Sequence, residues 1–313
     1  MAADVLIDVR NLRVDYEQVC AVRDLSLQVQ AGEVYGLIGP NGAGKTSTMR
    51  SVMGLIPPTS GSIHMNGVNL MEDHEAAVQQ IGFMPDFSPL YDDLTCWEYL
   101  DLFAHSYHVP VSRRRELIRQ HLEMVQLTEK TGQMTVGLSR GMKQRLMLAK
   151  TLIPDPPIIL LDEPASGMDP NARLLLKDIL IEQAKRGKAI MISSHILPEL
   201  SEMCTSVGIM ERGAMVVTGR VTDITARIMG HAELDIGVLS GEEQLSRVLR
   251  EDPRAGEPSQ HGDMIRVTYE GTPEETADLL ARLVASGVRV VSFNQRTVGL
   301  EEVFLKVGAR EVS

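Results

Sequence analysis

Residues 39–46 read Gly-Pro-Asn-Gly-Ala-Gly-Lys-Thr and have the types and spacing of a phosphate-binding loop. The three glycines allow the backbone to turn with its N–H groups pointing inward, which forms an anion-binding concavity. Lys45 supplies a point charge for the β- and γ-phosphates, and the Thr46 hydroxyl is a suitable ligand for Mg²⁺. The predicted nucleotide-binding residues here are Gly39, Pro40, Asn41, Gly42, Ala43, Gly44, Lys45, Thr46 and Ser47.

Two acids follow a second apolar stretch. Residues 158–161 are four successive aliphatic residues, typical of a fully buried parallel strand, and Asp162 and Glu163 come directly after them. Asp162 would lie at the carboxyl end of this strand, where α/β folds bind ligands, and could hold Mg²⁺ directly or through water. Glu163 could accept a proton from a water that attacks the γ-phosphate, or it could be a surface acid before a turn.

Three more side chains are candidates for the site. Residues 188–194 predict a buried strand that ends at His195, where the imidazole could act as a hydrogen-bonding switch beside the γ-phosphate. Ser139 is a plausible N-cap of a helix over residues 139–152, and a helix N-terminus can hold a phosphate. Tyr16 could stack on an adenine ring, although its spacing alone favours an ordinary residue at the end of a strand.

The elements around these residues alternate between strands and helices. Residues 5–16 and 21–29 alternate in part between apolar and polar side chains, which predicts strands of a half-buried sheet. An apolar run over 33–38 precedes the glycine loop and a helix-compatible stretch follows it. Residues 94–105 and 113–127 carry apolar side chains at near-helical spacing. The chain therefore inserts a largely helical segment between two α/β portions.

Composition excludes several classes of protein. The 313 residues include 31 basic and 42 acidic ones, and a net charge of −11 argues against a general nucleic-acid binder. The three cysteines are far apart and lack metal-ligand spacing, which favours reduced thiols. We expect no signal peptide at the N-terminus, and no apolar run approaches the ~18 residues that span a membrane. Any role at a membrane must therefore come through a partner.

Taken in order, these motifs resemble those of the ATP-binding subunits of ABC transporters, over residues 5–220. Residues 39–46 resemble the Walker A loop, and residues 158–163 resemble Walker B with its catalytic glutamate. Residues 138–142, Leu-Ser-Arg-Gly-Met, stand where the family has the signature Leu-Ser-Gly-Gly-Gln. Residues 166–169 resemble the D-loop. His195 matches the switch histidine of the family and Tyr16 its adenine-stacking aromatic residue, which strengthens both assignments.

The resemblance implies an α/β fold with a P-loop ATPase core, made of a RecA-like sheet and an antiparallel β subdomain. Residues 1–220 would be the ATP-binding domain, with an inserted helical subdomain at 86–152, and residues 221–313 a small accessory α/β domain. ATP and Mg²⁺ would be the cofactors, and the chain would be an ATPase. The implied catalytic residues are Glu163, His195 and Lys45, and the implied metal ligands are Thr46, Asp86 and Asp162.

The same resemblance implies partners. In this family ATP lies between the Walker motifs of one subunit and the signature of another, so Ser139 and Gly141 would contact a γ-phosphate in trans. We expect the second subunit to be an identical copy, although the sequence leaves a dimer of two different chains open. Transmembrane permease subunits would receive the motion through the helical segment, at the cytoplasmic face of a bacterial inner membrane. No nucleic-acid partner is expected.

Two departures from the family pattern stand out. Arg140 replaces the first signature glycine, which adds a cation near the phosphates but restricts close backbone approach, and Met142 replaces the glutamine. Asp86 stands where most members have the Q-loop glutamine, and an ionised aspartate only accepts hydrogen bonds. Asp86 could still bind Mg²⁺ or its water, or lower the rate. Both features resemble a subgroup that pairs with exporter-type permeases.

The C-terminal stretch contains no motif with chemistry. Its pattern predicts strands over 232–238, 264–269 and 288–293, a loop over 252–263, and helices over 242–251, 274–285 and 300–307. Regulation, dimer support and partner choice are all open as its role.

We conclude from the sequence that the chain powers an ABC-type exporter by ATP-driven dimer closure. Two alternatives stay open: a slowly hydrolysing ATP-gated clamp, motivated by Asp86 and Met142, and a soluble ABC-type ATPase.

Overall fold

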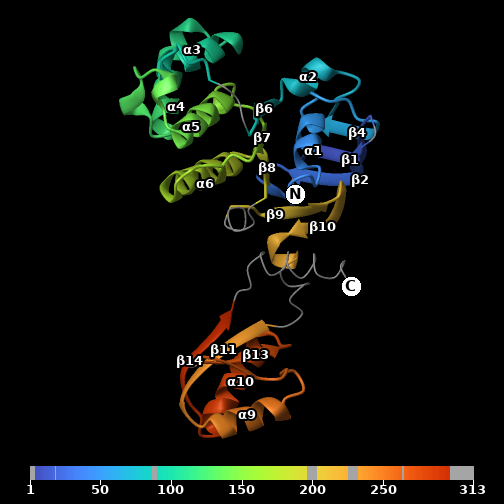
Figure 1. Cartoon of the computed structure of the whole chain (residues 1–313), viewed down its shortest axis with the longest axis vertical. Coiled ribbons are helices and arrows are strands. Elements are labelled where there is room, and N and C mark those ends of the chain that lie inside the picture. Colours follow the sequence, from blue (N-terminus) through green and yellow to red (C-terminus); the bar gives the residue numbers. More distant parts are fainter. Residues whose placement is uncertain are drawn as a thin grey trace. The chain divides into compact units, whose positions relative to one another are not determined.

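The aliphatic runs around the glycine loop become the buried strands of a six-stranded sheet, with the order β10-β9-β3-β8-β7-β6 (Figure 1). The five strands from β9 to β6 run parallel, and only β10 is antiparallel to its neighbour. The carboxyl ends of parallel strands meet at one edge, which is where α/β folds bind ligands. The strands are β3 (Val34–Ile38), β6 (Ile81–Met84), β7 (Ile158–Asp162), β8 (Ala189–Ser194), β9 (Ser206–Glu211) and β10 (Ala214–Arg220).

This computed structural model describes residues 4–17, 19–86, 90–195, 203–224, 232–262 and 264–296. The chain divides into two compact units, Met1–Val221 and Thr222–Ser313. We describe each unit by itself.

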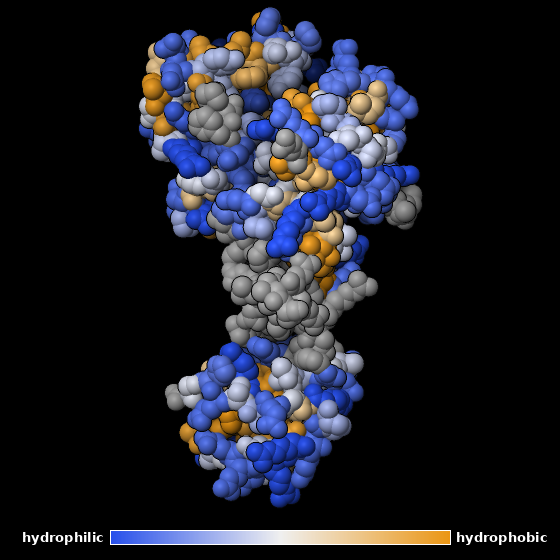
Figure 2. Space-filling model, turned by 45° about the vertical axis from the view of Figure 1, so that its right-hand side comes forward, coloured by the Kyte–Doolittle hydropathy of each residue, from blue (hydrophilic) through white to orange (hydrophobic). Residues whose placement is uncertain are grey.

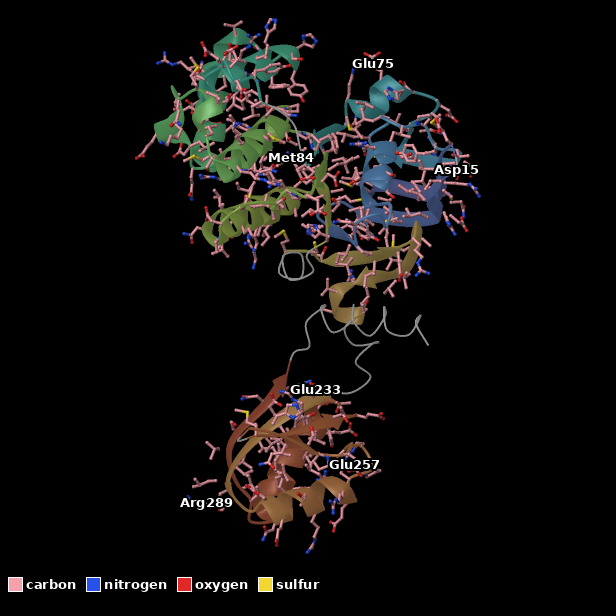
Figure 3. The ribbon with its side chains drawn as sticks, viewed as in Figure 1. Asp15, Glu75, Met84, Glu233, Glu257 and Arg289 are labelled. Carbon is pink, nitrogen blue, oxygen red and sulfur yellow. The ribbon has the colours of Figure 1, made fainter. Side chains whose placement is uncertain are left out.

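A second sheet in the first unit is antiparallel, with the order β2-β1-β4-β5. A tight turn at Asn66 and Gly67 joins β4 to β5, and both residues have positive φ, as the Asn-Gly pair predicts. Asp15 lies on β1 in this sheet (Figure 3). The strands are β1 (Val5–Tyr16), β2 (Val19–Gln30), β4 (Ser60–Met65) and β5 (Val68–Asn69).

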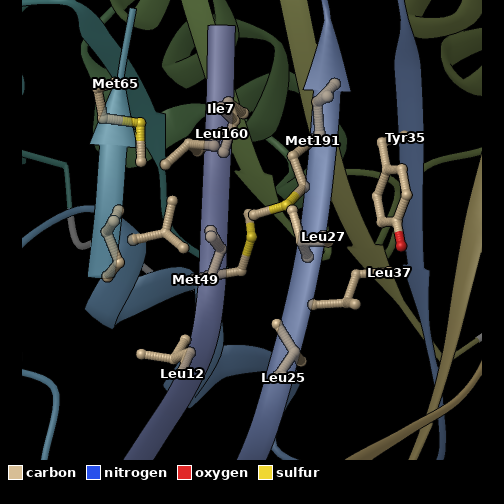
Figure 4. Packing of buried hydrophobic residues seen from close by; sticks show 14 of the residues in the cluster. Ile7, Leu12, Leu25, Leu27, Tyr35, Leu37, Met49, Met65, Leu160 and Met191 are labelled. Carbon is tan, nitrogen blue, oxygen red and sulfur yellow. The ribbon is translucent and has the colours of Figure 1, made fainter. Parts of the chain in front are cut away.

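One hydrophobic cluster joins the two sheets of this unit and helix α1 (Lys45–Val52) (Figure 4). Alternate residues of β1 and β2 contribute leucine and isoleucine side chains, and Met49 of α1 reaches the same interior. Leu160 of β7 and Met191 of β8 complete it from the parallel sheet. Because these side chains are almost fully buried, they fix the strand and the helix that flank the glycine loop.

Helices α3 (Cys96–Ser106), α4 (Val111–Met124) and α5 (Arg140–Leu152) pack on one another between β6 and β7 in the chain. Met84, at the end of β6, lies where the chain leaves the sheet for these helices (Figure 3). A capping box of Thr95 and Glu98 begins α3. The remaining elements of the unit are α2 (His74–Val78), α6 (Pro170–Lys185) and the short 3-10 helices Thr128–Lys130 and Thr135–Gly137.

Within its described residues, the second unit is a four-stranded antiparallel sheet with two helices against one face. Leu234 and Ile236 of β11 face the helices, whereas Asp235 between them lies on the other face of the strand. Glu257 and Arg289 are exposed, and hydrophilic residues predominate on the face of this unit seen in Figure 2 (Figures 2 and 3). The elements are β11 (Ala232–Ser240), α9 (Glu242–Glu251), β12 (Ser259–His261), β13 (Met264–Tyr269), α10 (Pro273–Ala285) and β14 (Arg289–Arg296).

The predicted α/β class and the order of the elements are confirmed. The expectation of an uninterrupted loop over 252–263 is wrong, because β12 pairs with β13 inside it. All three residues of β12 are exposed and polar. The sequence therefore lacks the alternation of apolar and polar residues that predicts a strand. The helix expected at 300–307 lies outside the described residues. No helix in the described ranges is long and apolar enough to cross a membrane.

Candidate ATP-binding and hydrolysis site

The glycine loop runs from the end of β3 to the start of α1, as its position in the sequence predicts. Gly42 and Gly44 have φ of 83° and 101°, in the left-handed region that favours glycine. A Cβ on Gly39 would lie 2.4 Å from the backbone oxygen of Met210, and one on Gly44 would lie 2.4 Å from that of Ala21. Conformation and close packing therefore both require glycine in this loop.

The other loop residues divide by exposure. Ala43 is buried, and its oxygen accepts a 3.0 Å hydrogen bond from the N–H of Gly213, which ties the loop to the turn after β9. Pro40 and Asn41 are exposed, and Ser47 is half-buried in the first turn of α1. The loop is thus anchored at its centre and open on one side.

Lys45 folds back over its own loop. Its Nζ donates to the oxygens of Gly39 at 2.7 Å and Pro40 at 3.2 Å, and it lies 3.9 Å from Oε1 of Glu163. Burial lowers the pKa of this ammonium, while the carboxylates of Glu163 and Asp162 act in the opposite direction. The structure therefore holds a buried cation above a concave backbone, an arrangement that favours an anion.

Asp162 ends β7 with only 3% of its surface exposed. Its Oδ1 accepts a hydrogen bond from Oγ of Ser193 and lies 3.5 Å from Oγ1 of Thr46. The strand and the helix thus bring together a carboxylate and a hydroxyl that the sequence separates by more than a hundred positions. These are oxygen donors of the kind that Mg²⁺ prefers.

Glu163 and His195 meet at the carboxyl ends of β7 and β8. Nδ1 of His195 donates to Oε2 of Glu163 at 2.9 Å. Both oxygens of this carboxylate therefore face a cationic or potentially cationic group, since Lys45 lies beside Oε1. Glu163 also has φ of 50°, which is uncommon for a residue with a side chain and often marks a functional position. The sequence predicted that these three residues would converge, and the structure brings them together.

No hydrogen bond or ion pair joins Asp86 or Tyr16 to this cluster within the described residues. The backbone oxygen of Asp86 accepts from Nε2 of Gln144 at 3.3 Å, but its carboxylate makes no hydrogen bond or ion pair within the described residues. Tyr16 ends β1 with 41% of its surface exposed. Gln144 was not among the predicted residues, and its buried amide shows that α5 is tied to the segment after β6.

The signature-like stretch begins α5. Ser139 is the N-cap, as predicted, and its Oγ accepts from the N–H of Met142 at 3.3 Å. No hydrogen bond or ion pair joins Ser139 or Gly141 to the glycine loop within the described part of the chain. A Cβ on Gly141 would find its nearest neighbours at 3.7 Å and 3.8 Å, which is ordinary contact. Packing within this chain therefore does not require glycine at position 141.

Arg140 contacts the D-loop-like segment of its own chain. Its Nη2 donates to Oγ of Ser166 at 2.8 Å in the D-loop-like segment of the same chain. Gly167 lies under this side chain, because a Cβ there would be 2.6 Å from Cδ of Arg140. The guanidinium therefore joins the start of α5 to the segment before α6.

Ser193 is the main site residue that sequence reasoning missed. It is fully buried beside Asp162 and contacts both acids. Its signal was a polar pair, Ser193 and Ser194, at the end of an otherwise apolar strand. No group of three or more His, Cys, Asp or Glu side chains arranged to hold a metal occurs in the described residues.

Comparisons with known proteins agree on one family. A family model described as "ABC transporter" matches residues 22–166. The Nod factor export ATP-binding protein I of Burkholderia lata is 33% identical over 309 residues, covering 98% of each chain. Its Rhizobium meliloti counterpart is 33% identical, covering 98% of this chain and 89% of that one. A solved ATP-binding subunit of an ABC transporter is 32% identical with a TM-score of 0.66, covering 71% of this chain and 92% of its own.

Proposed function

The chain belongs to the ATP-binding subunits of ABC transporters, ATPases that work with membrane permease components, and on that premise we propose a mechanism and a direction of transport. Two identical copies bind Mg²⁺-ATP between them, and hydrolysis powers export through a permease at the cytoplasmic face of a bacterial inner membrane. The cluster of Lys45, Glu163 and His195 carries the proposal for hydrolysis.

In this mechanism a water oxygen attacks the γ-phosphorus and the bond to the β–γ bridging oxygen breaks, releasing ADP and phosphate. Glu163 accepts the proton of the attacking water, because its carboxylate lies at the strand end beside Lys45. Lys45 and the loop N–H groups stabilise the phosphate charge. His195, which donates to Glu163 in this structure, transfers its hydrogen bond to the γ-phosphate.

In this structure, the hydrogen-bond donors of the cluster bond to protein atoms. Lys45 donates to two carbonyl oxygens of its own loop, and His195 donates to Glu163. The phosphates of ATP compete for the same donors because they carry more negative charge. Nucleotide binding therefore loosens both contacts to Glu163 and leaves its carboxylate available to accept a proton.

Thr46 and Asp162 would supply oxygens that fit Mg²⁺, since the Thr46 hydroxyl lies 3.5 Å from the Asp162 carboxylate. When bound, the ion neutralises charge on the β- and γ-phosphate oxygens. Asp86 is a further candidate ligand through water, because its carboxylate has no partner among the described residues. Tyr16 is the candidate for stacking on adenine.

The second copy is proposed from the signature. Ser139 and Arg140 are exposed, and Gly141 has room for a Cβ within its own chain. Packing within the chain does not require glycine at position 141. Glycine does allow a ligand to approach the backbone closely, and here that ligand is the γ-phosphate of the ATP bound to the second copy. Separately, we propose that the unit Met1–Val221 is the ATP-binding domain and that the unit Thr222–Ser313 is an accessory domain.

Export is proposed from relatives that match this chain over nearly its whole length and are named export ATP-binding proteins. The test is affinity purification of the full chain from detergent-solubilised native membranes, followed by identification of what accompanies it. A stoichiometric polytopic membrane protein is the expected result. Recovery without any membrane protein would contradict the proposal and favour the soluble ATPase. Vesicles that contain the complex then report the direction of transport.

A further inference from the structure

Ser193 sits between the two acids of the site. It is 0% exposed near the end of β8, directly opposite Asp162 in the register of β7 and β8. Its Oγ donates to Oδ1 of Asp162 and accepts from the N–H of Glu163 at 3.1 Å. A single hydroxyl therefore contacts both acids at the end of β7.

The second of these contacts lies where the backbone is strained. Glu163 adopts φ of 50°, and such conformations persist in residues with side chains only when the surroundings hold them. Its N–H points to two acceptors of one residue, because the backbone oxygen of Ser193 also lies at 3.1 Å. The turn that aims the Glu163 side chain is thus fastened to Ser193.

We propose that Ser193 is a positioning residue for ATP hydrolysis, and this rests on the function proposed above. Its hydroxyl fixes the orientation of the Asp162 carboxylate and the turn at Glu163 together. Only a hydroxyl does both, because Asp162 needs a donor and the Glu163 N–H needs an acceptor. Among the described residues, Thr46 is the only other donor to Oδ1 of Asp162, and at 3.5 Å it is a weak one.

Once Oδ1 is held by Ser193, the second oxygen of Asp162 makes no hydrogen bond to any described residue. That oxygen is available for Mg²⁺ or a water bound to it. Ser193 therefore determines which face of the carboxylate is presented, without touching the nucleotide itself.

The test compares four variants of the full chain: Ser193→Ala, Ser193→Thr, Ser193→Val and Ser51→Ala. Thr and Val have nearly the same shape and differ in the hydroxyl, so their comparison isolates the hydrogen bonds. Ser51 is the control because it is equally buried, on α1, and its Oγ has no hydrogen-bond partner among the described residues. Steady-state ATP turnover gives kcat and KM. Hydrogen exchange of the nucleotide-free protein reports protection of the Glu163 amide.

We expect the Ala and Val variants to lose at least about 10-fold in kcat, because small misplacements of catalytic groups are costly, while KM for ATP changes less than about 2-fold. The Thr variant recovers most of the loss. The Glu163 amide exchanges faster in the Ala and Val variants than in the Thr variant. The Ser51→Ala variant matches the parent in both measurements.

A Ser193→Ala variant with kcat within about 2-fold of the parent overturns the proposal, as do Thr and Val variants that are equally impaired. If the Ala variant does not fold, the Thr and Val pair decides. Glu163→Gln is measured alongside. If Glu163→Gln turns over ATP like the parent, the assignment of the base has failed. If it is inactive while Ser193→Ala is normal, only the role of Ser193 has failed.

Discussion

Each unit of this chain contains a cluster of acidic and basic side chains, and the two clusters are built differently. In the first unit, Glu163 lies 3.9 Å from Lys45 and accepts one hydrogen bond from His195, whose side chain is 43% exposed. In the second unit, the Asp252 side chain is fully buried and accepts from Arg254, Arg282 and the hydroxyl of Tyr269. The Glu163 carboxylate thus accepts a single hydrogen bond, whereas the Asp252 carboxylate accepts several.

This difference indicates which of the two carboxylates can accept a proton in a reaction. A carboxylate whose lone pairs are all occupied stabilises the fold but has little capacity to accept another proton. Asp252 joins the end of α9 to β13 and α10 through its partners, which is a structural role. In the proposed mechanism, a phosphate displaces the contacts of Glu163 to Lys45 and His195. The predictions below test this contrast, from the largest expected effect to the smallest.

Glu163→Gln removes the proposed base and should lower kcat by about 100-fold or more, the range for general base catalysis. Affinity for ATP should stay within about 3-fold, because the amide keeps the shape of the carboxylate. Single-turnover hydrolysis and equilibrium binding of ATP check both values. The control is Glu182→Gln on α6, an exposed residue whose change should leave turnover unaltered. Unchanged turnover in Glu163→Gln would remove Glu163 from the role of base.

Asp252→Ala leaves two arginines and a buried tyrosine hydroxyl without their shared acceptor. We expect the free energy of unfolding of the second unit to fall by about 2 kcal/mol, toward the low side for a broken buried ion pair because both arginines reach solvent. Hydrogen exchange of the α9 and α10 segments measures this loss. Glu243→Gln, on the exposed face of α9, is the control. If the Asp252→Ala variant is as stable as the parent but binds ATP with a different affinity, the structural role assigned to Asp252 is wrong.

Acid should weaken the second unit through the same residue. Burial raises the pKa of Asp252, but hydrogen bonds from Arg254 and Arg282 outweigh it and hold the pKa well below its usual range. The stabilisation is then complete above the unfolded pKa of about 3.9 and is lost as pH falls below it. Unfolding of α9 and α10 should therefore become easier between about pH 4 and pH 2, and less steeply so in Asp252→Asn. Equal slopes in the parent and the variant would contradict this.

Arg140→Gly restores the usual signature residue and removes the hydrogen bond to Ser166. We expect turnover to change by only about 2- to 5-fold, because this contact is exposed and positions rather than reacts. Ser166→Ala should have a similar effect, and the double variant should be no worse than either single one. A double-mutant cycle in kcat measures this coupling. Strictly additive effects would show that Arg140 acts elsewhere, for example on a phosphate.

Much of the site could be predicted because its chemistry is local in sequence. The glycine loop, the pair Asp162 and Glu163, and His195 each follow an apolar strand, and parallel strands bring their carboxyl ends to one edge. The polar pair at the end of β8 marks Ser193 in the sequence, but its contacts to the two acids could not be predicted, because they depend on the register between β7 and β8. The destination of the Arg140 side chain also depends on a segment more than twenty positions away.

In the second unit, too, local features could be predicted from the sequence and tertiary contacts could not. Its helices and longer strands followed from periodicity. Its buried cluster was missed because charged residues in a loop sequence look solvated. Asp252 and Arg254 lie in such a stretch, and only packing against Tyr269 and Arg282 shows that the aspartate is buried.

The most direct test of the central claim, that two copies complete one ATP site, is the mass of the Glu163→Gln chain in solution. Light scattering after size-exclusion chromatography should give a monomer without nucleotide and a dimer with Mg²⁺-ATP. Adding Gly141→Asp should abolish the dimer, because the Cβ has room within the chain while the new carboxylate repels the incoming phosphate. A chain that binds ATP and stays monomeric, or a dimer that tolerates Gly141→Asp, would contradict the account.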